Sequence, residues 1–333
     1  MSSPLKDDIL RGLRDAKGDW VSGEVFRIPA GVSRTAISKQ VKGLLGMGYD
    51  IESSPRKGYR LVFEPDVLTP EAVSPYLRGP RFRHDRYHYL DETTSTNDHA
   101  RNLAQAGAPE GTLVVAEAQR AGRGRRGRPW FGQRGNSLLF SIVLRPAFEP
   151  ARCTLLPLLT AVALRESLHA QTGLDIGIKW PNDLLVDGRK LAGILCEISS
   201  DLERVEHAIL GIGLNVNTPR NAFPKDIRNL GTSLYTAGRK KHRRARVLLG
   251  FLETLDPLLD LLWAGKTDAI LDRWRQASVT LGRTIEVDMP NGVVLKGKAV
   301  DVDGSGALLF KDQGGHLHVL TGGEVHLGTR RHG

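Results

Sequence analysis

The sequence has very little cysteine and no long apolar run. Its two cysteines, Cys153 and Cys196, have no second Cys or His at metal-ligand spacing, which excludes a disulfide scaffold and a zinc ribbon. Both are expected to be small core residues in a reducing compartment. No window approaches the roughly 18 consecutive apolar residues of a membrane span. The N-terminus lacks the apolar run and cleavage site of a signal peptide, so we expect a cytoplasmic protein without a membrane partner.

Positive charge, by contrast, is plentiful. The 333 residues include 47 Lys and Arg against 37 Asp and Glu, and 40% are hydrophobic. That length and apolar content allow about two domains, or three if one is small. The formal charge of +10 favours anionic partners such as nucleic acid, phosphate esters or acidic proteins. A generically soluble basic protein would show the same balance.

Residues 1–65 have the element order of a winged helix-turn-helix. Ser33 has N-cap chemistry for a helix over 34–45, and two short strands are expected at 49–53 and 58–63. In such a domain the start of the recognition helix enters the major groove, and the turn between the strands approaches phosphates. The predicted DNA contacts are Ser33, Arg34, Thr35, Ser38 and Lys39 in the groove, with Arg56 and Lys57 on the backbone.

Two features leave a protein-contact role open for this domain. Residues 1–65 carry eleven basic and eight acidic side chains, a net charge of only +3. Pro29 falls where the preceding helix should close, and a proline inside a helix costs about 3 kcal/mol. We therefore expect either that this helix ends at Ile28 or that the turn geometry differs from the usual one.

The rest of the chain predicts an α+β domain over 66–278 and a small β-barrel over 279–333. The central domain should contain a mixed sheet, with strands at 86–90, 113–118, 137–144, 176–180, 190–198 and 207–214 and helices at 96–106, 155–172 and 246–263. The tail alternates strands and turns, with strands expected at 284–289, 293–301, 307–311, 316–320 and 324–327.

The most informative segment is residues 119–131, QRAGRGRRGRPWF, with five arginines and three glycines. Glycines let successive backbone N–H groups converge on an anion, and guanidinium groups neutralise phosphate oxygens. Because Pro129-Trp130-Phe131 and a strand follow the segment, we expect it to be anchored in a fold. A bound phosphate-containing small molecule is therefore favoured over nonspecific RNA binding.

Other polar segments are weak individually. Ser95 and Thr96 start a helix, where they could cap it or, beside Gln119, hydrogen-bond a urea-like ligand. Lys190 opens the return strand of a hairpin and suits a carboxylate or an α-phosphate. The preceding pair Asn182–Asp183 could hold Mg²⁺ or ribose oxygens, or simply form a polar turn.

Taken together and in order, these segments resemble the bacterial bifunctional biotin–protein ligases that double as repressors of biotin synthesis. The likeness covers nearly the whole chain: SRTAIS and KGYRL match the winged helix, TTSTN, QRAGRGRRGRPW, KWPND, RKLAGIL and GIGLNVN the catalytic domain, and GALLF and GGEV the C-terminal domain. The resemblance implies a class II synthetase-like catalytic fold and an SH3-like C-terminal barrel.

The resemblance also implies an ATP-dependent, AMP-forming reaction. The carboxylate of biotin would attack the α-phosphorus of MgATP, giving biotinyl-5′-AMP and pyrophosphate, and a lysine of a biotin carboxyl carrier protein domain would then displace AMP. Binding to a DNA operator and formation of a homodimer in the adenylate-bound state are implied as well. Two alternatives are a DNA-binding regulator that only senses biotin or biotinyl-AMP, and a lipoate-type acyl ligase.

Site residues follow from matching positions in the family. The implied catalytic residues are Lys190, Arg123 and Arg125. The implied biotin contacts are Ser95, Thr96, Asn97, Gln119, Gly122, Arg123, Gly124, Arg125, Lys190, Gly193 and Gly213. The implied nucleotide contacts are Arg125, Arg128, Trp130, Asn182, Asp183 and Asn215, with Asp183 also a candidate Mg²⁺ ligand. The arginine-glycine segment is expected to close over the adenylate and exclude water.

Two stretches depart from this pattern or stand outside it. Between Asn217 and Gly231 there is no tryptophan that could stack on adenine, and Phe223 is the aromatic residue available. Residues 239–246 hold six Lys or Arg and one His in eight positions. We expect a solvated loop and helix start there, with a contact to acidic carrier protein or nucleic acid as the alternative.

Overall fold

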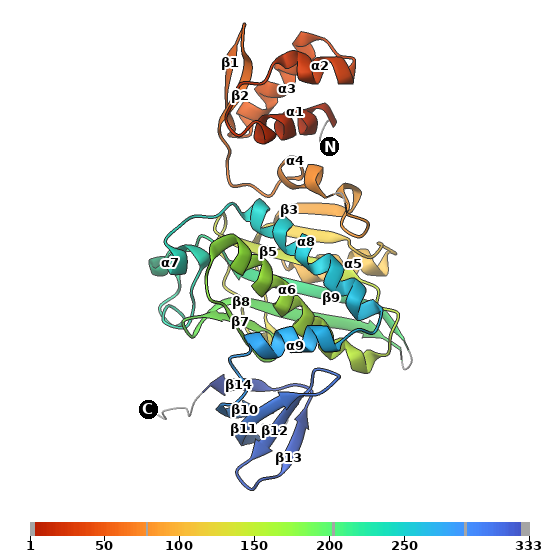
Figure 1. Cartoon of the computed structure of the whole chain (residues 1–333), viewed down its shortest axis with the longest axis vertical. Helices are drawn as coiled ribbons and strands as arrows, with labels where there is room; N and C mark the ends of the chain where they lie inside the picture. The colour runs from red at the N-terminus through yellow and green to blue at the C-terminus, as the bar shows by residue number, and fades with distance from the viewer. Residues whose placement is uncertain (1–3, 78, 202–203, 290–291, 328–333) are drawn as a thin grey trace.

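The computed structural model describes residues 4–77, 79–201, 204–289 and 292–327. It contains a two-stranded, a seven-stranded and a five-stranded sheet. Figure 1 shows the N-terminal helices and hairpin at one end, the large sheet in the middle and the small C-terminal sheet at the other end. Among the described residues, no helix combines the length and the hydrophobicity needed to cross a membrane.

The N-terminal unit has the predicted order of a winged helix-turn-helix. Its elements are α1 (Pro4–Asp15), α2 (Gly23–Ala30), α3 (Arg34–Gly46), β1 (Asp50–Ser54) and β2 (Gly58–Phe63). Ile9, Leu10 and Leu13 pack with Ile37 and Leu44 in a separate small core, as their helical spacing requires. The fold of this unit is therefore confirmed.

Helix α2 does not end at Ile28. It continues through Pro29 to Ala30, and Gly31 caps it in a left-handed conformation. The Gly31 N–H donates to the carbonyls of Arg27 and Ile28, so the last turn is closed without the N–H that Pro29 lacks. The proline thus falls in the final turn, where little of the helix remains to be disrupted.

The central sheet has the strand order β3-β4-β5-β9-β8-β7-β6. Only β3 and β4 pair in parallel; the other pairs are antiparallel, which confirms the mixed sheet. The strands are β3 (Tyr87–Thr93), β4 (Leu113–Gln119), β5 (Ser137–Leu144), β6 (Gly177–Lys179), β7 (Asp183–Val186), β8 (Arg189–Ser200) and β9 (Val205–Asn215).

Helices cover the two faces of this sheet unequally. Helices α6 (Leu155–Thr172), α8 (Arg244–Trp263) and α9 (Asp268–Ala277) lie across one face (Figure 1) and share its core. Helix α5 (Thr96–Gln105) packs its alanines against Val114, Val143 and Ile209 on the other face. That face remains open beyond the start of α5, which leaves room for a ligand.

Three elements of the central domain were not predicted from the sequence: α9, β7 and the short helix α7 (Leu234–Gly238). The spacing of Ile270, Leu271 and Trp274, all buried, is helical and could have revealed α9. Strand β7 has four residues, Asp183–Val186, which lie between the strands predicted at 176–180 and 190–198. The hairpin turn at Asp187 is therefore shorter than the prediction implied.

Short elements connect these layers: α4 (Pro70–Val73), α7 (Leu234–Gly238) and the 3₁₀ turns at Ser74–Tyr76, His84–Arg86, Arg125–Gly127, Pro150–Thr154 and Arg220–Ala222. The C-terminal sheet contains β10 (Thr284–Asp288), β11 (Val294–Val302), β12 (Leu308–Asp312), β13 (Leu317–Leu320) and β14 (Glu324–Leu327). All its pairs are antiparallel, and β13 and β14 form its two edges. The five predicted strands are confirmed.

Candidate active site

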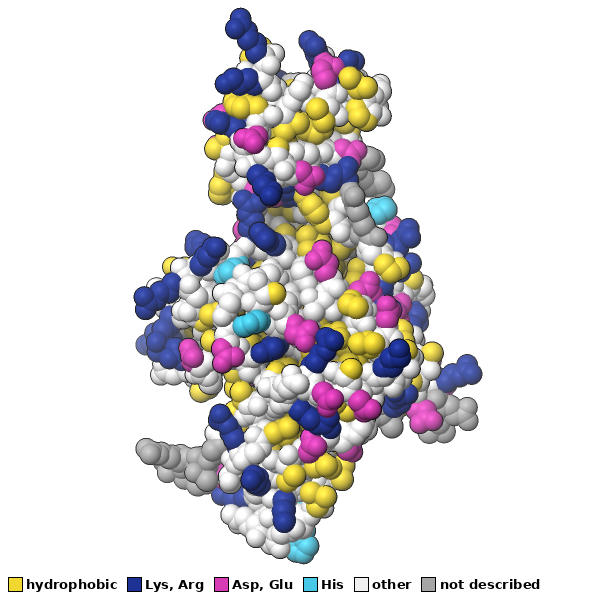
Figure 2. All heavy atoms as spheres, in the orientation of Figure 1, with side chains coloured by type: hydrophobic (Ala, Val, Ile, Leu, Met, Phe, Trp, Pro, Cys, Tyr) yellow, Lys and Arg dark blue, Asp and Glu magenta, His cyan; other side chains and the backbone are white. Residues whose placement is uncertain are grey.

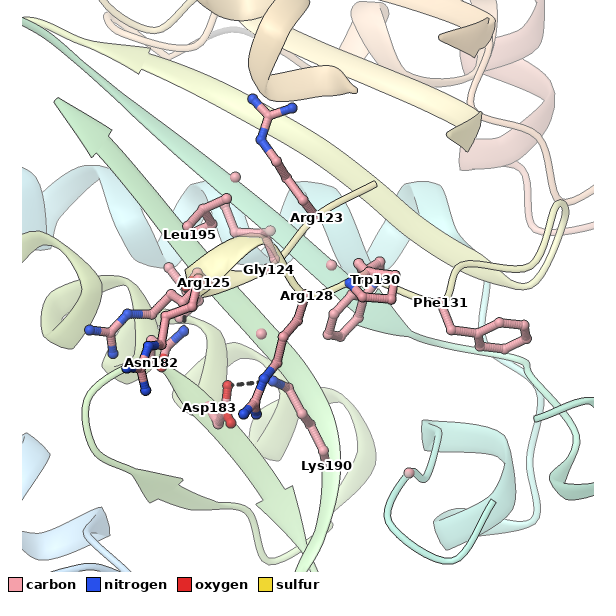
Figure 3. A pocket seen from close by; sticks show the side chains of 18 of the residues that line it. Arg123, Gly124, Arg125, Arg128, Trp130, Phe131, Asn182, Asp183, Lys190 and Leu195 are labelled. Atoms are coloured by element: carbon pink, nitrogen blue, oxygen red, sulfur yellow. Dashed lines mark hydrogen bonds and ion pairs between the residues drawn. The ribbon is translucent and has the colours of Figure 1, made fainter. Parts of the chain in front are cut away.

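A cavity of about 290 Å³ lies on the α5 face of the central sheet. Gly211 and Gly213 of β9 share this face with Ile209, because side chains alternate along a strand. The arginine-glycine segment covers the cavity, and residues 323–325 of the C-terminal sheet border it. Figure 3 shows labelled residues of the arginine-glycine segment and of the β7–β8 hairpin lying around one space.

One wall of the cavity is a polar network at the start of α5. The Gln119 Oε1 atom accepts hydrogen bonds from the Thr96 N–H at 2.7 Å and from Thr96 Oγ1 at 2.9 Å. Ser141 Oγ lies 2.8 Å from Thr96 Oγ1 and 2.6 Å from Asn97 Oδ1, so it can donate to either. Ser95 is buried and makes no capping hydrogen bond, so helix capping does not explain this serine.

Arg123 is oriented away from the centre of the cavity. Its Nη1 donates to Asp98 Oδ2 at 2.9 Å, and Glu197 lies 3.6 Å away. The hydrogen bond from Arg123 lowers the pKa of Asp98, and the carboxylate raises the pKa of Arg123 in return. In Figure 3 its guanidinium points away from Lys190 and Asp183. The Arg123 side chain is therefore engaged in ion pairs within the protein, and Arg123 also lines the cavity.

Three other arginines of the segment reach the C-terminal sheet. Arg125 Nη1 donates to the Gly323 carbonyl at 3.4 Å, Arg126 Nη2 donates to the Met289 carbonyl at 3.1 Å, and Arg128 forms an ion pair with Glu324. Burial lowers the pKa of Arg125. Within the segment, Trp130 N–H donates to the Gly122 carbonyl at 2.8 Å and Gly124 N–H to the Arg128 carbonyl at 2.7 Å. The segment is thus a loop whose two arms are joined by its own backbone hydrogen bonds, and it lies between the central and the C-terminal sheet.

Lys190 and Trp130 occupy the floor of the cavity. Lys190 Nζ lies 2.7 Å from Asp183 Oδ1 and 5.5 Å from the centre of the Trp130 ring. A Cβ on Gly213 would lie 2.3 Å from Trp130 Cε2, and one on Gly193 would lie 2.9 Å from Trp130 Cζ3. Both positions require glycine because the indole rests directly on the strands.

Four buried polar atoms in the lining lack a hydrogen-bond partner among the described residues: Trp130 Nε1, Asn215 Oδ1, Asp183 Oδ1 and Glu324 Oε2. The two carboxylate oxygens have ion-pair partners in Lys190 and Arg126, so Trp130 Nε1 and Asn215 Oδ1 are the two left without either kind of contact. Each unpaired group costs about 1–3 kcal/mol, so both favour a polar ligand in the cavity. Asn182, in contrast, uses its amide to donate to the Ile194 carbonyl at 2.7 Å, which stabilises the β7–β8 hairpin.

Several lining residues were absent from the predicted set. Phe131 is one of these, and its ring centre lies 5.5 Å from that of Phe223. Phe223 itself, the aromatic residue that the sequence offered for stacking on adenine, also lines the cavity. Lys179 also lines it, with a pKa lowered by burial, and Glu324 enters from the C-terminal sheet. Phe131 and Lys179 lie inside the motifs QRAGRGRRGRPWF and KWPND and could have been included. Nothing in the sequence near Glu324 connects that residue to this site.

The site fits a divalent cation only in part. Asp183 offers the carboxylate oxygen that Mg²⁺ prefers, but Lys190 already contacts that carboxylate. Among the described residues, one group of three potential metal ligands lies close together: Asp288, Glu324 and His326. In that group, Glu324 already forms an ion pair with Arg128. A cation at Asp183 would therefore have to share the carboxylate with the Lys190 ammonium.

The predicted DNA contacts lie on the surface of the N-terminal unit. Ser33 caps α3, its Oγ accepting from the Ala36 N–H at 3.2 Å. Arg34, Thr35 and Lys39 are exposed on α3 and Ser38 is half-buried. Arg56 and Lys57 are exposed in the turn between β1 and β2.

Comparison with known proteins agrees with each part of this architecture. Family models match residues 6–60 (HTH domain), 89–215 (Biotin/lipoate A/B protein ligase family) and 280–328 (Biotin protein ligase C terminal domain). The fold and the site therefore define a ligase of the biotin/lipoate class that carries a helix-turn-helix domain.

Whole-chain relatives are more specific. The chain is 36% identical to the bifunctional ligase/repressor BirA of Bacillus spizizenii, over 98% of this chain and all of the relative, and 30% identical to that of Escherichia coli over 94% of both. The chain belongs to this family of bifunctional ligase/repressors. A solved biotin protein ligase from Aquifex aeolicus, in complex with biotin and ATP, covers 73% of the chain and 99% of its own length at 28% identity and a TM-score of 0.63.

Proposed function

We propose that this protein is a biotin–protein ligase that also represses transcription in response to biotin. It activates biotin with ATP to biotinyl-5′-AMP, releasing pyrophosphate, and then transfers biotin to a lysine of a biotin carboxyl carrier protein domain, releasing AMP. The observation that carries the proposal is the cavity under the arginine-glycine loop, floored by Lys190 and Trp130, in a chain that matches bifunctional ligase/repressors from end to end.

The residues divide into three roles. Ser95, Thr96, Asn97 and Gln119 receive the polar head of biotin, with the backbone of the loop above it. Lys190 supplies positive charge beside the reacting carboxylate and α-phosphate, where charge develops during attack. Arg125, Arg128 and Trp130 cover the nucleotide, and Asn182 and Asn215 border it. We assign Arg123 a positioning role, because Asp98 already engages its guanidinium.

The chain's own contribution to catalysis is positioning and charge stabilisation. No enzyme nucleophile is needed, since the carboxylate attacks phosphorus directly and the carrier lysine attacks the resulting anhydride. Asp183 is the residue that would hold Mg²⁺ bound with ATP, and the cation would supply neutralisation of phosphate charge there. The loop and the bordering C-terminal strand exclude water from the anhydride.

Purified protein, MgATP, biotin and the biotin-accepting carrier domain of acetyl-CoA carboxylase test the ligase proposal. We expect covalent biotin on the carrier lysine, measured by mass spectrometry, and no comparable product with lipoate. Adenylate formation without transfer would identify a biotin sensor instead, and modification by lipoate in preference to biotin would identify a lipoate-type ligase.

Repression requires that the start of α3 reads DNA. We expect Arg34→Ala/Lys39→Ala to bind duplexes at least about 30-fold more weakly than the wild type, because two contacts are lost and each base or phosphate contact costs about 1–3 kcal/mol. The duplexes are selected from a random-sequence pool by the wild-type protein with biotin and MgATP. Arg11→Ala, on α1, is the matched control. Equal affinity of the two variants would contradict a DNA-reading role for α3.

Two further properties complete the proposal. The adenylate-bound form is a homodimer, since a two-fold operator needs two recognition helices. The protein acts in the cytoplasm, where biotin, ATP and the carrier protein meet.

A further inference from the structure

The chain's excess of positive charge is concentrated beside the mouth of the cavity. Residues 219–246 contain nine Lys and Arg against a single acidic residue, Asp226. The formal charge of the whole chain is only +10, so this segment accounts for most of it. Figure 2 shows Lys and Arg side chains gathered at the left edge of the molecule, over the α7 projection of Figure 1.

These charges differ from those of the arginine-glycine loop. Around that loop, Arg120 pairs with Glu92, Arg123 with Asp98 and Arg128 with Glu324. In residues 219–246, by contrast, ion pairs among the described residues involve only Arg243 and Arg244. We define the basic rim as the exposed side chains without an acidic partner in the loops on either side of α7, before α8 begins: Arg220, Lys225, Arg239, Lys240 and Lys241.

The basic rim is fixed to the wall of the cavity. Ser233 Oγ donates to the Thr218 carbonyl at 2.6 Å, which packs the start of α7 on the base of the 219–231 loop. Asn217, which follows the lining residue Asn215 by two positions in the sequence, donates from its side-chain amide to the His242 carbonyl at 2.8 Å. In the 219–231 loop, Leu230 lines the cavity although the residue is 65% exposed. This loop therefore forms the mouth of the cavity.

We propose that the basic rim docks an acidic face of the carrier domain. This proposal rests on the transfer reaction proposed above. The acceptor lysine must reach the cavity, so the carrier surface around that lysine lies against the mouth. Unpaired positive charge there attracts an acidic surface and speeds its encounter. Nucleic acid is the weaker candidate, because α3 and the β1–β2 turn lie at the far end of the molecule from the C-terminal sheet, whereas α7 projects from the middle (Figure 1).

Charge reversal of the basic rim tests this docking. The test variant is Lys225→Glu/Lys240→Glu/Lys241→Glu, and the control Lys266→Glu/Lys298→Glu/Lys311→Glu changes net charge equally at exposed positions elsewhere. We expect kcat/KM for the acetyl-CoA carboxylase carrier domain to fall about tenfold or more in the test variant at low salt. The difference from wild type should shrink as salt is raised, and the control should stay within about twofold of wild type.

A second readout separates docking from adenylation. Hydroxylamine, a small nucleophile that needs no docking surface, traps the adenylate as biotinyl hydroxamate, and we expect equal rates in all three proteins. If wild-type protein forms no hydroxamate, the proposed ligase function itself fails. If it does, docking is overturned when the test variant serves the carrier as well as the control, or when it loses hydroxamate formation too. Normal carrier transfer with weakened DNA retention would identify the rim as a nucleic acid surface.

Discussion

Lys190→Ala is expected to lower the rate of pyrophosphate release by about 100-fold or more, the usual effect of removing one preorganised charge that stabilises a transition state. Biotin affinity should change by less than about tenfold, because the polar head is held by the α5 network rather than by this ammonium. The measurements are pyrophosphate release with saturating MgATP and biotin, and biotin binding by calorimetry.

Loss of folding is not expected to confuse this result. The Lys190 side chain is 39% exposed. The backbone N–H of Lys190 donates to the Leu230 carbonyl and its carbonyl accepts from the Thr232 N–H, and these backbone bonds do not depend on the side chain. Asp183→Asn is the informative companion, because it releases the ammonium from its ion pair without removing it. If Lys190→Ala released pyrophosphate at the wild-type rate, the lysine would have no role in activation.

Arg244→Met is expected to destabilise the central domain by about 3–5 kcal/mol, the cost of removing one partner from a buried ion pair. Arg244 is only 1% exposed; its Nη1 donates to Glu117 Oε2 at 2.7 Å and its Nε to Asp66 Oδ2 at 3.1 Å. Burial alone would lower the pKa of Arg244, but the Glu117 and Asp66 carboxylates outweigh it and raise that pKa. The substitution leaves the Glu117 carboxyl group buried without its ion-pair partner.

The adjacent arginine supplies the control. Arg243 pairs with Glu64 but is 53% exposed, so Arg243→Ala should cost less than about 1 kcal/mol. The double variant Arg244→Met/Glu117→Leu removes both charges and should recover much of the lost stability. Calorimetry of the central-domain transition measures all three, and similar transitions for Arg244→Met and Arg243→Ala would refute a structural role for the buried pair.

Residues 239–246 show where local pattern misleads. Their composition predicts a solvated loop and helix start, and this is right for Arg239, Lys240 and Lys241, which are exposed. It is wrong for Arg244, which lies under the sheet against Glu117. The two residues are 127 positions apart, and nothing in the neighbourhood of either one predicts the pairing.

The sequence by itself determined the mixed sheet, the family, the order of most elements and about half of the residues that line the cavity. Caps, alternation and glycine-rich turns act over a few residues, so they can be interpreted without knowing the fold. The tertiary structure alone decided which arginines are internal, that Trp130 rests on Gly193 and Gly213, and that Glu324 enters from another sheet. An arginine has the same chemistry at every position, and only strand register and burial determine whether a carboxylate, a ligand or water faces it.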